Sequence, residues 1–452
     1  MFLAMLTYLV LVLVRPQDYP DLVETLRVPL LPIALLTAGL FWVLSGRKRF
    51  DAPQYLLLVM FFGVLMFSHV ANGWFGGAVE QISKFAPTLL AFLVMANAAS
   101  SPARVRVVMG VFTFCAALLA LHGIEQVKLG TGWTGIGLSQ GTRIQYVGIF
   151  NDPNDLGMLF VTCIPMACYL ASRGGWAGLA RIFWLIAALV LLYGIYLTNS
   201  RGTLLSLLVV MGVYLWWRRG VVLAGILGFF ALLAMLALPS RFQEIDAAEA
   251  SAAGRVDSWY EGLQMFREYP LFGVGAERYT DYNALTAHNS FVLVLAETGI
   301  VGFCVWIAFV GYCFRMMYAG MSQGTVSEAE LYGDATGMDG DPLEAPHADG
   351  DEDAFYMEAD DEVLADDRAM AFTLFLALCA FFTAAFFLSR SYLVVLYLLA
   401  ALATAHYAGM RDRNPDLPSF NLKRDVVRWP VLAVAGVVGL YVVVKLLLVV
   451  AS

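Results

Sequence analysis

The sequence contains thirteen separate runs of apolar residues, most of them about as long as a helix that crosses a lipid bilayer. A crossing takes about 20 helical residues, because the hydrocarbon core is about 30 Å thick. Charged residues make up 14 % of the 452 positions, against about 25 % in soluble domains. The sequence therefore predicts an all-α polytopic integral membrane protein with twelve or thirteen transmembrane helices. The runs lie near residues 2–15, 28–45, 53–72, 79–99, 105–125, 155–172, 181–198, 202–217, 221–238, 290–315, 369–388, 391–408 and 429–450.

The first run is short, and its fourteen residues reach only about 21 Å as a helix. It has neither a basic amino-terminal region nor a small-residue cleavage site, so we expect a retained helix and not a signal peptide. Lys and Arg in short loops mark the cytoplasmic side of such proteins. Their distribution predicts a cytoplasmic amino terminus and outward connections near residues 16–27, 73–78, 126–154, 199–201, 239–289 and 389–390.

The net charge of −8 hides two oppositely charged parts of the chain. Residues 319–367 hold sixteen Asp and Glu and no Lys or Arg. The remaining 20 acidic residues face 28 basic ones, an excess of eight positive charges. An acidic segment with scattered Gly, Pro and Ser buries too little apolar surface to fold. We therefore expect an acidic, disordered cytoplasmic linker at 319–367, which acts as a spacer or as a docking segment.

The six cysteines lie within or at the ends of apolar runs, and none has the spacing of a metal ligand. A buried cysteine usually behaves as a small apolar side chain. We therefore expect no disulfide, no bound metal and no cofactor.

Two outward connections, 126–154 and 239–289, are much longer than the others. In the second, apolar residues recur at helical spacing before Pro270 and the glycines of "GVG", which predicts a helix on the membrane surface followed by a turn. The simpler alternative is a helix that only anchors the loop at the interface. The chain thus divides into amino-terminal transmembrane helices (1–125), a core with both long outer loops (126–318), the acidic linker (319–367) and carboxyl-terminal transmembrane helices (368–452).

Two arginines stand on the outward side, against the usual bias. Arg201 opens the run at 202–217, and Arg255 opens the amphipathic part of the second loop. A guanidinium offers a planar fork of donors that matches phosphate oxygens, and a helix start also favours an anion. The alternatives are an interfacial anchor for Arg201 and a salt bridge from Arg255 to Asp257 or Glu261.

His288 ends the second outer loop, in "AHNSFVLVLAETGIVG" (287–302). Its imidazole can accept a proton at neutral pH, which suits a general base at the boundary between water and membrane. A capping or packing role is the alternative, as it is for His69, His122 and His406. Glu297 lies nine residues further on, on the opposite helix face, so it cannot orient His288 directly and needs a partner from another span.

The order "SRG" (200–202), "GRVDSWYEGLQMF" followed by Pro270 and "GVG", and "HNSFVLVLAETGIVG" resembles the O-antigen ligase and polymerase superfamily. "FNDPNDLGM" (150–158) resembles the Asn-Pro-Asn segment of that family. The match covers roughly residues 145–310. Members are membrane glycosyltransferases of the GT-C type that act at the outer face of the bacterial inner membrane.

The resemblance implies transfer of a glycan from an undecaprenyl diphosphate carrier to an acceptor hydroxyl, without metal or nucleotide sugar. It implies that Arg201 and Arg255 hold the diphosphate and that His288 takes or directs the acceptor proton. The acceptor is a lipid, a glycan or a protein, and nucleic acid is not a partner. Further residues that we expect to position donor or acceptor are Asn289, Asn151, Asp152, Asn154, Asp155 and Lys84.

Several alternatives stay open. Asp152 and Asp155 cap the run at 155–172 or position an acceptor sugar. The enzyme is either a ligase that transfers a finished glycan or a polymerase that joins lipid-linked repeats. A polymerase needs a second outward basic cluster, for which the candidates are Lys84, Arg143, Arg278 and Arg390. A transporter or flippase of an anionic lipid-linked sugar would show paired broken helices and an internal repeat, and we find neither in the sequence.

Overall fold

The computed structural model of the chain describes residues 1–19, 22, 28–46, 48–174, 178–237, 245–323 and 350–451. Nearly all regular structure in these residues is helical. Their β pairing consists of two isolated bridges, Thr131 with Gly137 and Ser139 with Arg143. The predicted all-α class is therefore confirmed.

Each of the thirteen predicted runs coincides with a helix. They are α1 (Phe2–Val14), α3 (Leu30–Leu44), α4 (Pro53–Ala71), α5 (Phe75–Ala98), α6 (Pro102–Leu129), α7 (Pro153–Ser172), α8 (Leu179–Leu197), α9 (Arg201–Arg219), α10 (Val221–Ala237), α13 (Ser290–Met321), α15 (Gly350–Ala385), α16 (Val394–Arg413) and α17 (Arg428–Ala451). The outer loops add α11 (Ile245–Glu268), the short α12 (Tyr279–Tyr282) and 3-10 turns at Pro16–Asp18 and Gly148–Phe150.

Within the described ranges, nine helices are long and apolar enough to cross a membrane: α4, α5, α6, α7, α8, α13, α15, α16 and α17. The polytopic membrane class is confirmed. The other four predicted runs form helices that are too short or too polar by this measure. α1, α3 and α10 have 13, 15 and 17 residues, and α9 contains Arg201, Arg218 and Arg219.

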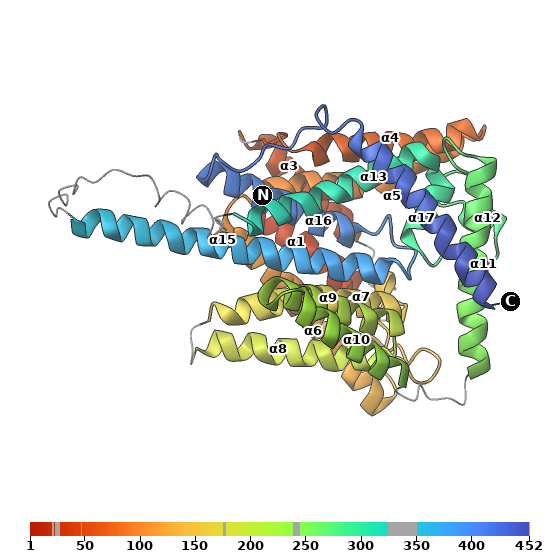
Figure 1. Ribbon diagram of the computed structural model, residues 1–452, viewed down its shortest axis with the longest axis horizontal. Coiled ribbons are helices and arrows are strands. Elements are labelled where there is room, and N and C mark those ends of the chain that lie inside the picture. The colour runs from red at the N-terminus through yellow and green to blue at the C-terminus, as the bar shows by residue number, and fades with distance from the viewer. Residues whose placement is uncertain are drawn as a thin grey trace, which may run out of the picture.

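The helices form a bundle (Figure 1), and α7 and α16 are the most buried of the nine. In their apolar stretches, 89 % of the α7 residues and 83 % of the α16 residues are buried, against 22 % in α17. The exposed residues of α8 and α17 are mainly Leu, Ile, Val and Phe, as lipid-facing surfaces require. α11 lies across one end of the bundle in Figure 1.

The end of the predicted linker is helical. α15 begins at Gly350, so residues 350–367 belong to a helix and not to a disordered segment, while 324–349 lie outside the described residues. Asp366 contacts Arg173 at 2.9 Å, and Asp367 makes a bidentate ion pair with Arg413 at 2.8–2.9 Å. These ion pairs fasten the last two residues of the acidic segment to Arg173, which follows α7, and to Arg413 at the end of α16, whereas the start of α15 projects beyond the other helices (Figure 1).

Contacts between distant connections define the two ends of the bundle. At one end, the Thr286 hydroxyl donates to the Ser389 hydroxyl at 2.8 Å, and Arg143 donates to the Thr198 carbonyl at 2.9 Å. At the other end, Arg49 pairs with Asp412, and Arg315 pairs with Asp425 at 2.6 Å. The described parts of the connections 126–154, 239–289 and 389–390, which we expect to face outward, therefore lie at one end, which we call the outer end, and the basic connections lie at the other.

Candidate functional site

The site is built at the outer end around the turn that precedes α13. His288 has a left-handed backbone, with φ of 47°, a conformation that costs a residue with a Cβ about 1–2 kcal/mol. Asn289 is buried and caps α13, because its Oδ1 accepts from the amides of Phe291 at 2.9 Å and Val292 at 3.1 Å. Its oxygen thus holds the helix start beside His288, while its Nδ2 has no hydrogen-bond partner among the described residues, and a role of Asn289 in positioning a substrate stays a prediction.

Three charged side chains from three other parts of the chain surround His288: Arg255 on α11, Asp152 before α7, and Arg390 between α15 and α16. The imidazole is half-buried and has no hydrogen-bond partner among the described residues. Burial lowers the pKa of His288, the Arg255 and Arg390 charges lower it further, and Asp152 opposes them. A lowered pKa leaves the imidazole neutral at pH 7, the form that accepts a proton.

Arg255 lines a small pocket beside this turn. The guanidinium is half-buried, and within the described parts of the chain it has no hydrogen bond or ion pair. Burial lowers its pKa, and nearby Asp152 opposes that effect. An arginine held half out of water without a partner is suited to bind an anion. The pocket is also lined by Asn154, Ser200, Gly202, Thr203, Ala384, Phe387 and Leu388.

Arg201 is placed differently from Arg255. It is the first residue of α9, after Ser200, whose hydroxyl caps the helix by accepting from the Thr203 amide at 3.3 Å. Its neighbours Ser200 and Gly202 line the pocket, but the exposed Arg201 side chain does not. The structure thus brings Arg255 and His288 together and leaves the Arg201 side chain exposed, outside the lining of the pocket.

The segment at 151–155 contributes caps and ion pairs. The Asp152 carboxylate accepts from the Asn154 amide at 2.7 Å at the start of α7. Asn154 in turn accepts from Arg143 at 2.9 Å, and Asp155 pairs with Arg390. Asn151 is exposed and has no such contact among the described residues. Asp152 therefore caps α7, which is one of the two roles predicted for it, and its negative charge also acts on the His288 imidazole.

Arg143 and Arg390 join the same site. The sequence shows them only as candidates for a second basic cluster, because nothing local to either residue indicates which loop it meets. Two other candidates lie elsewhere at the outer end. Lys84 pairs with Glu277 at 2.6 Å, and Arg278 pairs with Asp281 at 2.8 Å. Both of these cations are already neutralised by the chain itself, so they do not form an open second cluster.

Glu297 supports the loop before α12 and does not reach His288. α13 is interrupted at Gly299, whose φ of 63° and ψ of −165° are not helical. One carboxylate oxygen of Glu297 accepts from the Tyr279 amide at 3.1 Å, and the other accepts from the Tyr392 hydroxyl at 2.7 Å. Tyr392 is therefore the partner that we expected Glu297 to find in another part of the chain. Both contacts are internal to the protein, so Glu297 is a structural residue.

The break in α13 is closed by residues 270–275. The amide of Val274 donates to the Ala296 carbonyl, and that of Gly275 to the Glu297 carbonyl, both at 3.0 Å. In the other direction, the amide of Ile300 donates to the Pro270 carbonyl at 2.9 Å. Backbone groups that lack water must find partners within the protein, so the "GVG" and "ETGIVG" motifs form one docked unit.

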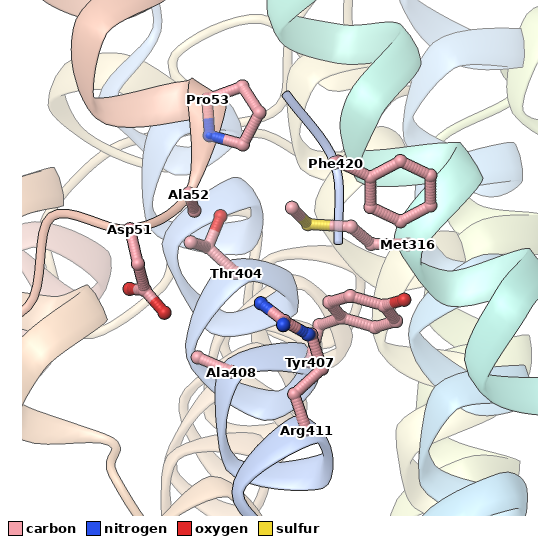
Figure 2. A pocket seen from close by; sticks show the side chains of 9 residues that line it. All are labelled: Asp51, Ala52, Pro53, Met316, Thr404, Tyr407, Ala408, Arg411 and Phe420. Atoms are coloured by element: carbon pink, nitrogen blue, oxygen red, sulfur yellow. The ribbon is translucent and has the colours of Figure 1, made fainter. Parts of the chain in front are cut away.

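A second pocket lies at the opposite end of the bundle, between the start of α4, α13 and the end of α16 (Figure 2). Arg411 and Asp51 are its charged lining residues. It contains no histidine and none of the predicted site residues, so we place the candidate site at the outer end. No group of three or more His, Cys, Asp or Glu side chains in the described residues is arranged to hold a metal ion.

Comparison with known proteins gives two matches. Residues 186–307 match the family described as O-Antigen ligase. A stretch of 209 residues is 23 % identical to an O-antigen polymerase of Salmonella muenchen, covering 42 % of this chain and 50 % of the relative. The chain thus spans half the length of that curated relative. The predicted resemblance to the O-antigen ligase and polymerase superfamily is confirmed, and the family match contains Arg201, Arg255 and His288.

Proposed function

We propose that this protein transfers a glycan from an undecaprenyl diphosphate carrier to an acceptor hydroxyl at the outer face of the bacterial inner membrane. The observation that carries the proposal is the half-buried Arg255, which has no partner in the described residues and lies beside a neutral, unbonded His288. A membrane location with polysaccharide chemistry agrees with the apolar helices and the family match.

In the proposed reaction, neutral His288 accepts the proton of the acceptor hydroxyl as its oxygen attacks the anomeric carbon of the glycan. The bond between that carbon and the phosphate oxygen breaks, and its electron pair leaves on the carrier diphosphate. Arg255 stabilises the charge that develops there, a task for which a preorganised donor contributes about 3–4 kcal/mol. His288 then releases its proton to water.

Arg143, Arg201 and Lys84 contribute to different extents in this proposal. Arg143 is held by Asn154 and the Thr198 carbonyl, so it adds positive potential without moving. Arg201 stands at the pocket rim, where a long side chain can reach a diphosphate as the lipid enters from the membrane. Lys84 is engaged by Glu277, and we assign it no contact with donor or acceptor.

A polymerase that joins two lipid-linked repeats is the second candidate function. The observation in its favour is the similarity to an O-antigen polymerase over 42 % of the chain. A polymerase must hold two carrier diphosphates, and the pairing of Lys84 and Arg278 with acidic residues argues against a second open site. We therefore favour the ligase, with a lipid, glycan or protein hydroxyl as acceptor.

The test is transfer by the purified protein in lipid bilayers. Undecaprenyl diphosphate-linked glycan is supplied with no acceptor, with lipopolysaccharide core, or with a glycosyl acceptor, and products are identified by mass spectrometry. A product joined to an added acceptor supports a ligase, and a carrier-linked dimer of repeats without acceptor supports a polymerase. The variant His288→Ala should lose at least a hundredfold in rate, with donor binding retained. Equal rates for wild type and His288→Ala would contradict the proposal.

A further inference from the structure

A buried ion pair lies behind the His288 turn. Both Nε and Nη2 of Arg390 donate to the Asp155 carboxylate, one to each oxygen. The Asp155 side chain is fully buried, while that of Arg390 is 34 % exposed. A buried carboxylate is costly unless it is paired, and the planar fork of a guanidinium is the partner that fits it best. The pair joins α7 to the segment between α15 and α16.

That segment is fastened to the first residue of α13. The Arg390 amide donates to the Ser290 hydroxyl at 2.9 Å, and this hydroxyl donates to the Leu388 carbonyl at 2.6 Å. The Ser391 hydroxyl donates to the Ser290 carbonyl at 2.8 Å. Ser290 is thus held on both its side chain and its backbone, two residues after His288.

The His288 turn needs such support. A left-handed backbone at a residue with a Cβ persists only where its surroundings determine it. The turn receives one constraint from Asn289, which caps α13, and the others from residues 388–391. The latter lie about 100 residues away in the sequence and outside the 186–307 family match.

We propose that the Asp155–Arg390 pair positions the proton-accepting imidazole and places the Arg390 charge beside it. This inference rests on the proposed function of His288. Arg390 is a positioning residue, because its fork is occupied by Asp155 and its effect passes through Ser290 and through the electrostatic potential at the ring.

The charges that face His288 come from every element packed around it. Arg255 on α11 and Arg390 before α16 disfavour the imidazolium, and Asp152 before α7 favours it. Arg143 is coupled to Arg255 and Asp152. Asp155 is not among the charges that act on His288, so removing both members of the pair still removes one of the two cations that oppose protonation, and the pKa of His288 should rise.

The test measures His288 directly. Diethyl pyrocarbonate modifies a histidine only while its imidazole is neutral. The pH dependence of modification, read by mass spectrometry on the His288 peptide, therefore reports its protonation without any substrate. Full-length protein in lipid bilayers is compared as wild type, Arg390→Gln, and the double variant Asp155→Asn/Arg390→Gln. The double variant leaves no unpaired buried charge and keeps the experiment decisive if Arg390→Gln alone fails to fold. Arg278→Gln is the control, since it removes another outer-end arginine.

The expected result is a modification midpoint at higher pH in the double variant and an unchanged midpoint in Arg278→Gln. Ser290→Ala should leave the midpoint in place and lower turnover by roughly ten- to a hundredfold, because it loosens the turn without changing a charge. An unchanged midpoint in the folded double variant would overturn the inference. If instead His288→Ala retains full transfer, the proposed function fails, while the modification data still show whether the pair controls the ring.

Discussion

Replacing Gly299 by alanine should separate α13 from the loop that closes its break. The φ of 63° and ψ of −165° at Gly299 fall in a region that only glycine adopts readily. A Cβ added there would lie 2.4 Å from the carbonyl carbon and oxygen of Leu271 and 2.6 Å from the Phe272 amide nitrogen. Those atoms are backbone, so they cannot move aside without moving the loop.

The expected destabilisation can be worked out from these contacts. The strained backbone costs about 1–3 kcal/mol. Displacement of the loop also breaks the hydrogen bonds from Ile300 to Pro270 and from Val301 to Leu271, each of which contributes about 1 kcal/mol. The sum is about 3–5 kcal/mol of unfolding free energy.

The matched control is Gly212→Ala on α9, where an added Cβ meets no atom within 4 Å and the backbone is helical. It should be neutral or stabilising by up to about 1 kcal/mol. Thermal unfolding of both variants in the same lipid and detergent mixture, followed by a thiol-reactive dye, gives their apparent Tm. An apparent Tm for Gly299→Ala equal to that of Gly212→Ala would refute the account of the docked loop.

Three further predictions concern the site and the topology. Arg255→Lys should lose most transfer activity, because lysine keeps the charge but lacks the planar fork of donors. Arg201→Lys should lose less, because the Arg201 side chain is exposed. Donor titrations at equal membrane abundance measure both losses, and a larger loss in Arg201→Lys would contradict this order. Because burial and two arginines lower the pKa of His288, transfer activity should stay level through neutral pH and fall only below about pH 6.5. The residual activity of His288→Ala should not show this fall at acidic pH. In a cysteine-free background, the single variants Ser251→Cys and Ser327→Cys should differ in their labelling; Ser327 lies outside the described residues. A membrane-impermeant thiol reagent should label position 251 in intact cells but not position 327. The opposite pattern would invert the topology.

The sequence alone determined the fold class and the position of nearly every helix. Both depend on local properties, namely the length of each apolar run and its helical periodicity. The same local reasoning placed the amphipathic helix α11, whose Trp259 and Leu263 are buried as their spacing predicts. It also proposed His288, which directly precedes an apolar run, and Arg255, which opens the amphipathic segment, because both positions are visible without knowledge of their neighbours.

Only the tertiary structure decided which side chains meet. Asp155 and Arg390 are 235 residues apart, and no periodicity links them, because their contact depends on how α7 and α15 pack. The same holds for Glu297, whose partner Tyr392 lies 95 residues away. The ion pairs at the end of the acidic segment likewise involve distant residues, Arg173 after α7 and Arg413 at the end of α16. Hydropathy is a property of a segment, whereas the pairing of buried charges is a property of the whole packed bundle, so the first was predictable and the second was not.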